Sequence, residues 1–266
     1  MSPQQLLTHY DSGQCWPQAG SASLGYDISS AYKDALAVRE LRLARGEIPR
    51  GYKIGFTNRT IWPRYNVFGP LWGTVWNSTL NFCAGIHDVS VKGFCQPRIE
   101  PEIVFGFKET PKPEATIDDI YQSLDWIAPG FEVVQSHILG WKFNAADAIA
   151  DGGLHGRLIV GEKTSVTTMA SSAQELHALL AKASVALYRK ETQVEIGVGA
   201  NVLDSPVHAL AYFLKELRGC PGATDIQAGD VVTTGTWTDA YPIESGQTWR
   251  ASFSAPLSSL TVNFED

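Results

Sequence analysis

The chain has 266 residues, of which 44% are hydrophobic and 18% are charged, so it can bury a sizeable core. Its net charge of -7 and its pI near 5.4 argue against nucleic acid or an anionic membrane as a partner, because both require a basic surface. The sequence lacks both an apolar run of membrane-spanning length and the pattern of a secretory signal, so we expect a cytoplasmic protein. Its four cysteines are scattered without a C-x-x-C motif and are expected to be free, buried thiols.

Residues 1–50 are predicted to form a helical N-terminal segment. A short helix is expected near residues 4–10, and a stretch rich in Gly, Ser and Pro follows it to about residue 25. A longer helix then begins, with Ser29 or Ser30 as its cap, and ends at Gly46. Four basic side chains of this helix are expected to face solvent: Lys33, Arg39, Arg42 and Arg45.

Residues 51–266 are predicted to form a β-rich domain that is continuous with the helical segment as one structural unit. Its first strand covers residues 52–57, where apolar residues alternate with a lysine and a glycine. Lys53 therefore leaves the strand on the face opposite to Tyr52 and Ile54. It is either an exposed strand lysine or an active-site cation.

The rest of the chain predicts an α+β fold with a dominant antiparallel or mixed sheet. Helices are expected to begin at Thr116, near Ser171 and at Ser205, and residues 69–73 and 144–153 are expected to form a turn and a loop beside a site. Further strands are expected around Glu132 and at residues 88–92, 96–108, 154–161, 185–189, 193–198, 231–234, 249–253 and 260–264.

Three acids occur in strand-like surroundings. Glu100 and Glu102 are two positions apart in a segment rich in Ile, Val and Phe, so both carboxylates leave the same face of a strand. Glu132 lies in a second β-rich run. Three converging carboxylates repel one another, and a hard divalent cation relieves that repulsion, so the pattern indicates a metal site. The alternative is a solvated edge strand, which Pro101 favours because proline cannot donate to a ladder.

Six short segments carry a family resemblance: 51–57, 69–73, 100–102, Glu132, 150–151 and 228–236. In this order they resemble the 2-keto-4-pentenoate hydratase and 4-oxalocrotonate decarboxylase group of the fumarylacetoacetate hydrolase superfamily. The resemblance covers nearly the whole chain. It implies a fumarylacetoacetate-hydrolase-like roll of mixed β-sheet with a helical N-terminal part, in a homo-oligomer that acts on a small 2-oxo or 2-hydroxy-dienoic acid.

The resemblance also implies roles for particular residues. It implies Mg²⁺ or Mn²⁺ bound by Glu100, Glu102 and Glu132. The lysine of the family's G-x-K-x-G motif corresponds to Lys53, which either moves protons with a lowered pKa or neutralises the substrate carboxylate. The implied substrate-binding residues are Asp151, Thr234, Gly235 and Thr236.

The chain departs from the family pattern at several positions. The departures are Asn77 and Ser78 in place of an acid, Gln135 and His137 in place of Asp and Arg, and Asp151-Gly152-Gly153-Leu154 in place of Asp-Asn-Ala-Ser. His137 or His155 is an alternative base, although a structural role is the simpler interpretation of either. Five tryptophans are candidates to line a pocket for a bulky substrate, or are simply buried: Trp62, Trp72, Trp76, Trp141 and Trp237.

Three functions are consistent with these features. The first is a metal-dependent hydratase that adds water to a 2-hydroxy-2,4-dienoate and forms a 4-hydroxy-2-oxo acid, as in aromatic-compound catabolism. The second keeps the metal but decarboxylates a 4-oxalocrotonate-like 2-oxo acid or hydrolyses an acylpyruvate, and the missing acid at Asn77 and Ser78 favours it. The third is a catalytically silent subunit that binds the metal and assembles with an active homologue.

Overall fold

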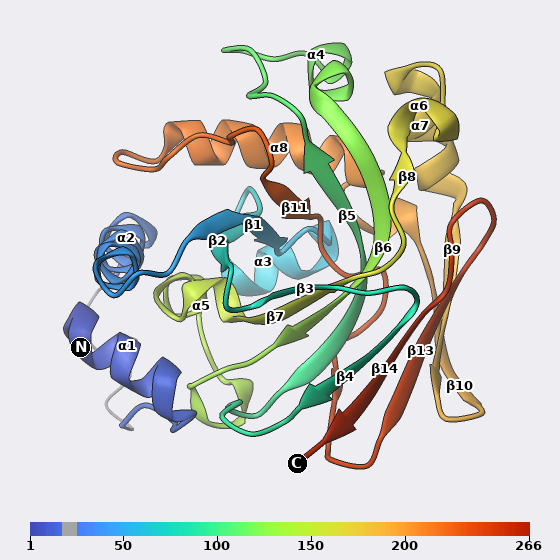
Figure 1. Ribbon diagram of the computed structural model, residues 1–266. Helices are drawn as coiled ribbons and strands as arrows, with labels where there is room; N and C mark the ends of the chain where they lie inside the picture. Colours follow the sequence, from blue (N-terminus) through green and yellow to red (C-terminus); the bar gives the residue numbers. More distant parts are fainter. Residues whose placement is uncertain (18–25) are drawn as a thin grey trace.

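The computed structural model describes residues 1–17 and 26–266, which form an α+β structure built around two sheets (Figure 1). Residues 18–25 of the predicted Gly, Ser and Pro stretch lie outside the described residues. The α-helices are α1 (Pro3–Ser12), α2 (Ile28–Ala44), α3 (Trp62–Tyr65), α4 (Ile117–Ser123), α5 (Ala145–Ala150), α6 (Val166–Met169), α7 (Ala173–Lys182) and α8 (Pro206–Gly219). Within the described residues, 3₁₀ turns connect other elements at η2 (Arg59–Ile61), η3 (Leu139–Trp141), η4 (Gly152–Leu154) and η5 (Gly199–Asn201).

The larger sheet is mixed, and its strands follow the order β2-β1-β11-β5-β6-β7-β3, with β12 paired to β5 and β8 to β6. Its strands are β1 (Pro49–Gly55), β2 (Leu71–Trp76), β3 (Leu80–Phe82), β5 (Arg98–Phe107), β6 (Leu124–Val134), β7 (His155–Val160), β8 (Thr164–Ser165), β11 (Val231–Thr233) and β12 (Tyr241–Pro242). The second sheet has the order β10-β9-β13-β14-β4. Its strands are β4 (Ile86–Ser90), β9 (Ser184–Arg189), β10 (Thr192–Val198), β13 (Thr248–Phe253) and β14 (Leu260–Glu265).

The larger sheet curls so that β2 approaches β7 and one face becomes an interior (Figure 1). Glu100, Glu102 and Val104 alternate onto this face of β5, and Val104 lies opposite Ala128 of β6. Six buried apolar side chains form a cluster that is separate from the main core: Val75, Val104, Ala128, Leu158, Val160 and Val231. The acids therefore share the concave face with a small apolar floor.

Strand β1 runs between β2 and β11 and presents different residues to its two faces. Tyr52 and Ile54 belong to the main core, where the Tyr52 ring lies 5.4 Å from the ring of Phe213 on α8. Lys53 leaves the other face beside Thr233, as the alternation predicts. Gly51 allows β11 to come close, because a Cβ atom at Gly51 would meet the Val231 carbonyl oxygen at 1.8 Å. The alternation thus directs Lys53 into the interior of the curled sheet.

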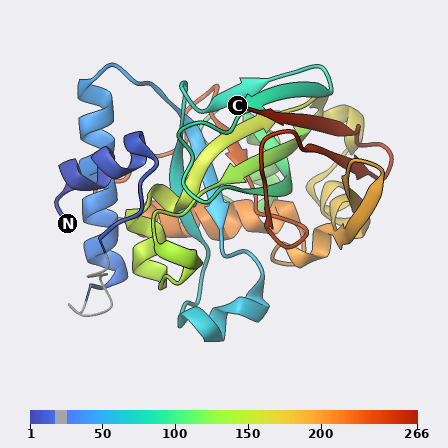
Figure 2. The ribbon, with the colours of Figure 1, turned by 90° about the horizontal axis from the view of Figure 1, so that it is seen from below.

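Helices α1 and α2 lie side by side at one end of the molecule, with α5 against α2 (Figures 1 and 2). Two expectations for α2 are wrong. Its N-cap is Asp27, whose carboxylate accepts a 2.7 Å hydrogen bond from the Ser30 amide. Arg42 does not face solvent, because its guanidinium is paired with Glu47 at 2.7 Å and the residue is only 5% exposed, and the Arg39 side chain is only 13% exposed. The sequence indicates a basic helix face, but the packing of α1 covers part of it.

Two predicted irregular segments are regular in the structure. Most of the predicted turn at residues 69–73 belongs to β2. The predicted loop at 144–153 contains helix α5, in which Asn144 and Asp147 form a capping box and all six helical residues are buried. The alanines of α5 allow it to pack closely against α2. The composition of this segment alone did not reveal the helix. No described helix is both long and apolar enough to cross a membrane.

Candidate metal centre and active site

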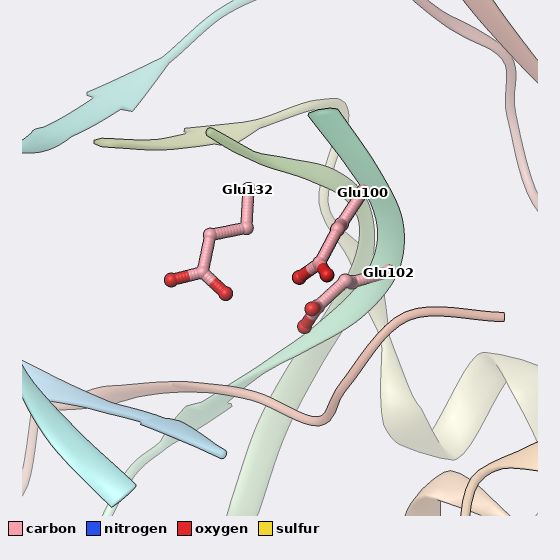
Figure 3. Close-up of side chains that lie close together, drawn as sticks. All are labelled: Glu100, Glu102 and Glu132. Atoms are coloured by element: carbon pink, nitrogen blue, oxygen red, sulfur yellow. The ribbon is translucent and has the colours of Figure 1, made fainter. Parts of the chain in front are cut away.

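The register of β5 and β6 brings the three acids together. Glu100 pairs with Glu132, and Glu102 pairs with Gly130, so all three carboxylates meet on one face (Figure 3). One oxygen of each lies within 4.8 Å of the others. Glu102 and Glu132 are 0% exposed, which excludes the solvated-edge alternative. The sequence predicts this cluster, and the pairing of the strands creates it.

Pro101 lies inside the sheet and not at its edge, at a position where one side of β5 has no partner strand. β12 pairs with Ile99, β11 pairs with Val104, and the chain between them crosses the gap. The Trp237 amide donates to the Pro101 carbonyl at 3.1 Å. Because the nitrogen and carbonyl of one strand residue point to the same side, the proline nitrogen also faces this gap.

Burial and mutual repulsion raise the pKa values of two of the acids, Glu100 and Glu102. Burial, together with the charge of Glu132, raises the pKa of Glu100 to about 7, although Lys53 opposes this. Burial, followed by the charges of Glu132 and Glu100, raises the pKa of Glu102 well above its usual range. The three carboxylates therefore cannot all remain ionised at low cost unless a cation joins them.

The hydrogen bonds around Glu102 leave one of its oxygens free. Its Oε2 accepts hydrogen bonds from the Gly235 amide at 2.7 Å and from the Thr233 hydroxyl. Its Oε1 is buried and has no hydrogen-bond partner among the described residues. A buried oxygen without a partner, beside two further carboxylates, fits a hard divalent cation such as Mg²⁺, Mn²⁺ or Ca²⁺. The residues present therefore fit a metal of this class.

Glu132 lies between two basic side chains. His155 Nδ1 is 2.8 Å from Glu132 Oε1, and Lys53 Nζ is 3.1 Å from Oε2, as an ion pair without hydrogen-bond geometry. The other ring nitrogen of His155 is 2.9 Å from the Thr79 hydroxyl. Burial lowers the pKa of His155, and Glu132 partly opposes that change. Both ring nitrogens are engaged, so His155 positions Glu132, as its structural interpretation expects.

Lys53 is 3% exposed, so the exposed-lysine alternative is wrong. Its ammonium donates to the Gly153 carbonyl at 2.8 Å. Burial alone lowers the pKa of Lys53, but the charges of Glu132, Glu100 and Glu102 outweigh burial, and the pKa is raised. Among the described residues the three carboxylates therefore hold the amine as a cation, and the alternative of a lowered pKa beside a bound metal ion stays a prediction.

A cavity of about 170 Å³ lies beside the acids. Its lining includes Lys53, Glu100, Gly235 and Thr236. Gly235 is required here, because it has φ +100° and a Cβ atom would lie 2.0 Å from the Thr57 hydroxyl oxygen. Thr234 does not line this cavity, and its hydroxyl donates to the Ile103 carbonyl at 3.0 Å.

Asp151 lies away from this cavity. Its carboxylate accepts a 2.8 Å hydrogen bond from the His137 amide, and its other oxygen lies 2.6 Å from His137 Nδ1. Burial raises the pKa of Asp151, while His137 opposes that change. Asp151 and His155 line a smaller cavity of about 50 Å³, between the N-terminal helices and β2. The role of Asp151 as a substrate ligand stays a prediction.

Comparison with known proteins agrees with this architecture. The chain is 30% identical over 222 residues to a 2-hydroxyhexa-2,4-dienoate hydratase of Comamonas testosteroni, covering 82% of this chain and 80% of that one. It is 31% identical over 198 residues to a 2-hydroxypent-2,4-dienoate hydratase of Pseudomonas putida, covering 73% and 85%. The chain belongs to the 2-keto-4-pentenoate hydratase and 4-oxalocrotonate decarboxylase group of the fumarylacetoacetate hydrolase superfamily. A scan against family models found no match.

Solved structures of this superfamily share the fold. The 4-oxalocrotonate decarboxylase of Pseudomonas putida G7, complexed with magnesium and adipate, superposes with a TM-score of 0.87 at 23% identity, covering 98% of this chain and 95% of that one. Fumarylpyruvate hydrolase of Pseudomonas aeruginosa, complexed with Mn²⁺ and pyruvate, gives a TM-score of 0.57 at 13% identity, covering 82% and 90%. The predicted α+β fold of this superfamily is confirmed.

The departures at Asn77, Ser78 and Gln135 serve local structure, whereas Gly153 and Leu154 line the larger cavity. The Asn77 side chain accepts from the Ile48 amide at 2.8 Å, and the Ser78 hydroxyl donates to Glu47. Gln135 accepts from the Cys95 amide at 3.0 Å. Asn77, Ser78, Gln135 and His137 line neither of the two cavities. Of the five candidate tryptophans, Trp141 alone lines the larger cavity in the described part of the chain. The sequence patterns did not point to Thr233, Thr79 or the Gly153 carbonyl.

Proposed function

We propose that this chain is a divalent-metal-dependent hydro-lyase that adds water to a 2-hydroxy-2,4-dienoate and forms a 4-hydroxy-2-oxo acid. The two relatives at 30% and 31% identity are named as hydratases of such dienoates. The observation that carries the proposal is the convergence of three carboxylates and one buried ammonium group beside a single cavity, with Glu102 and Glu132 fully buried and Glu100 in the cavity lining. A 2-hydroxy-dienoate has a carboxylate and an adjacent oxygen at C2. The ammonium group can neutralise the carboxylate, and a metal ion beside it can bind the oxygen.

Glu100, Glu102 and Glu132 would hold the ion, for which we propose Mg²⁺ or Mn²⁺. Similar solved structures are described with magnesium and with Mn²⁺. When bound, such an ion acts as a Lewis acid that stabilises negative charge on the oxygen at C2 of the substrate. The Gly235 amide and His155 fix the orientation of Glu102 and Glu132, as partners of metal ligands commonly do.

Lys53 supplies the positive charge that neutralises the substrate carboxylate. Its ammonium lines the cavity and is held by Glu132 and the Gly153 carbonyl. Gly235 and Thr236 line the same cavity and are proposed to contact the substrate. Thr234 and Asp151 stay predictions as substrate ligands, because neither lines it. The walls exclude bulk water from most of the charged groups, which strengthens their interactions with a bound anion.

Decarboxylation of a 4-oxalocrotonate-like acid, or hydrolysis of an acylpyruvate, is the second candidate. Two observations favour it. Asn77 and Ser78 contribute no acid to the cavity, and Glu100 is the one acidic side chain in its described lining. The second observation is the similarity of the fold to that of the 4-oxalocrotonate decarboxylase structure. The third candidate, a catalytically silent subunit, predicts metal binding without turnover of any of these acids.

The test is the loss of dienol absorbance when purified protein and 2-hydroxypenta-2,4-dienoate are mixed with Mg²⁺, and again with EDTA. We expect turnover that EDTA abolishes, with 4-hydroxy-2-oxopentanoate as the product. Glu102→Gln should abolish both turnover and Mn²⁺ binding by calorimetry, whereas Glu162→Gln, at an exposed position, should change neither. Mn²⁺ binding without consumption of the dienol would rule out the hydratase.

A second pair of variants tests Lys53 separately from the metal. Lys53→Met should keep Mn²⁺ binding but lose about 10²–10³-fold in kcat/KM, the range typical of removing one group that stabilises charge in an active site. Lys142→Met, at an exposed position, is the matched control and should retain activity. Full activity of Lys53→Met would contradict the role proposed for the ammonium group.

We also propose a homo-oligomer located in the cytoplasm. The family resemblance implies the homo-oligomer, and the side chains of Phe68 and Ile86, which are 85% and 65% exposed, are candidates for contacts between copies. The four cysteines are free, as in a reducing compartment, but the expectation that they are buried is correct only for Cys95. Sedimentation of the purified protein tests the assembly, and a monomer at micromolar concentration would contradict it.

A further inference from the structure

A row of aromatic rings forms part of the wall of the larger cavity. Phe56 follows β1, Tyr65 ends α3, and Trp141 and Phe143 lie between β6 and α5. The ring centroids of Phe56 and Tyr65 are 4.7 Å apart, and those of Tyr65 and Phe143, and of Phe143 and Trp141, are each 5.9 Å apart. Because each ring lies against the next, these residues present one continuous apolar surface to the part of a bound ligand that extends away from the three carboxylates.

The indole N–H of Trp141 is not free to bind a ligand. It donates to the Gln96 carbonyl at 3.0 Å. Leu71, Ile61 and Leu154 add aliphatic surface to the same lining. The wall therefore offers hydrocarbon contact to a ligand. Apart from Lys53 and Glu100, the hydrogen-bonding side chains in the same lining are uncharged: Thr57, Asn58, Tyr65 and Thr236.

Positive charge in the described lining comes from Lys53 alone. Arg64 and Arg98 lie near the wall but outside the lining, with their guanidinium carbons 5.4 Å from the Tyr65 ring centroid and 4.4 Å from the Trp141 ring centroid. Arg59, next to a lining residue, is paired with both oxygens of Asp204 at 2.8 Å. A second carboxylate on the substrate would thus be desolvated against aromatic rings without a partner cation, which is costly.

We propose that this site takes monocarboxylate 2-hydroxy-dienoates with a short, uncharged apolar tail and discriminates against those that end in a second carboxylate. The inference rests on the proposed function for the placement of the first carboxylate. The volume of about 170 Å³ suits a short tail, since cavities for drug-sized ligands measure about 300–1,000 Å³. The inferred preference also separates the two candidate reactions. 4-Oxalocrotonate, the substrate of the decarboxylation, is a diacid, whereas the dienoate that its decarboxylation leaves, a substrate for hydration, is a monoacid.

Binding of unreactive analogues tests the inference without requiring turnover. 2-Oxohexanoate and 2-oxohexanedioate have six carbons each and differ only in the second carboxylate at C6. Neither has a carbon–carbon double bond that the enzyme could hydrate. Calorimetry with the Mg²⁺-loaded protein should give a Kd at least tenfold lower for the monoacid. Equal affinities, tighter binding of the diacid, or no binding of either acid would overturn the proposal.

A charge introduced into the wall provides the second measurement. Phe143→Arg should reduce or reverse the preference for the monoacid, whereas Phe143→Leu should keep it. Phe82→Arg is the matched control, because Phe82 is 48% exposed and does not line the cavity. An unchanged preference in a folded Phe143→Arg variant would contradict the assignment of the wall. If Phe143→Arg does not fold, the analogue comparison on the wild-type protein still decides the matter.

The two proposals fail in different ways. Preference for the monoacid without hydration of any dienoate would leave the substrate class in place and remove the hydratase. Hydration of mono- and dicarboxylate dienoates with equal kcat/KM would leave the hydratase in place and remove the inferred specificity.

Discussion

His155 Nδ1 lies 2.8 Å from Glu132 Oε1, and both side chains are buried. Thr79 holds the other ring nitrogen at 2.9 Å, so the imidazole cannot turn without losing a partner. Glu132 is therefore presented to the other two acids in one orientation. This link extends the metal centre from β6 to β7 and to the turn after β2.

Removal of the imidazole should weaken metal binding without removing a ligand. We expect His155→Ala to raise the Kd for Mn²⁺ about 10–100-fold, the usual effect of losing a partner of a metal ligand. Calorimetric titration with Mn²⁺ measures this directly. His177→Ala, a half-buried histidine on α7, is the control and should bind Mn²⁺ as the wild type does. Wild-type affinity in His155→Ala would show that Glu132 does not depend on this histidine.

A methyl group at Gly235 should damage the metal site beyond its cost in backbone strain. Gly229 has φ +90° and Gly235 φ +100°, but only at Gly235 would a Cβ meet another atom, the Thr57 hydroxyl oxygen at 2.0 Å. Gly229→Ala should cost about 1–2 kcal/mol of unfolding free energy from strain alone. Gly235→Ala should cost more than that and should also weaken Mn²⁺ binding, because its amide hydrogen bond to Glu102 must shift.

Urea unfolding and Mn²⁺ titration of both glycine variants provide the comparison. If Gly235→Ala loses no more stability than Gly229→Ala and binds Mn²⁺ normally, the packing of Thr57 against Gly235 is not a constraint on the site.

The ion pairs of Glu47 should make folding stability depend on pH. Burial raises the pKa of Glu47, but hydrogen bonds from Arg42, Ser78 and Arg45 outweigh burial and lower it from 4.5 to about 2. A carboxyl whose pKa is lower in the folded state adds stability above its unfolded pKa, and that stability is lost as the pH falls towards the folded pKa. The stabilisation should thus be complete above about pH 4.5 and should disappear towards pH 2.

Denaturation of the wild type and Glu47→Gln across this range measures the effect. The difference in unfolding free energy between them should be largest near neutral pH and should shrink from pH 4.5 to pH 2. Glu40→Gln, whose side chain is 72% exposed, should show no such trend. A constant difference between wild type and Glu47→Gln at all pH values would contradict this account of the network.

The strands of the site could be predicted because alternation with period two is a local property. It separates Lys53 from Tyr52 and Ile54, and it directs Glu100 and Glu102 to one side of β5, as the structure confirms. Helix caps were less certain when several candidates were adjacent, and Asp27 was missed in favour of Ser29 or Ser30. Helix α5 was missed because its six residues, four of which are alanine, have no apolar period, and its packing against α2 stabilises it.

The sequence by itself determined which residue types are available and on which face of each strand they lie. Only the tertiary structure decided that Glu132 is paired with Glu100, that Lys53 reaches Glu132, and that Asp151 turns to His137 and not to the larger cavity. It also placed four aromatic rings from three separate segments in one wall. The physical reason is that faces follow from local backbone geometry, whereas register and cavity walls depend on contacts between residues far apart in the chain.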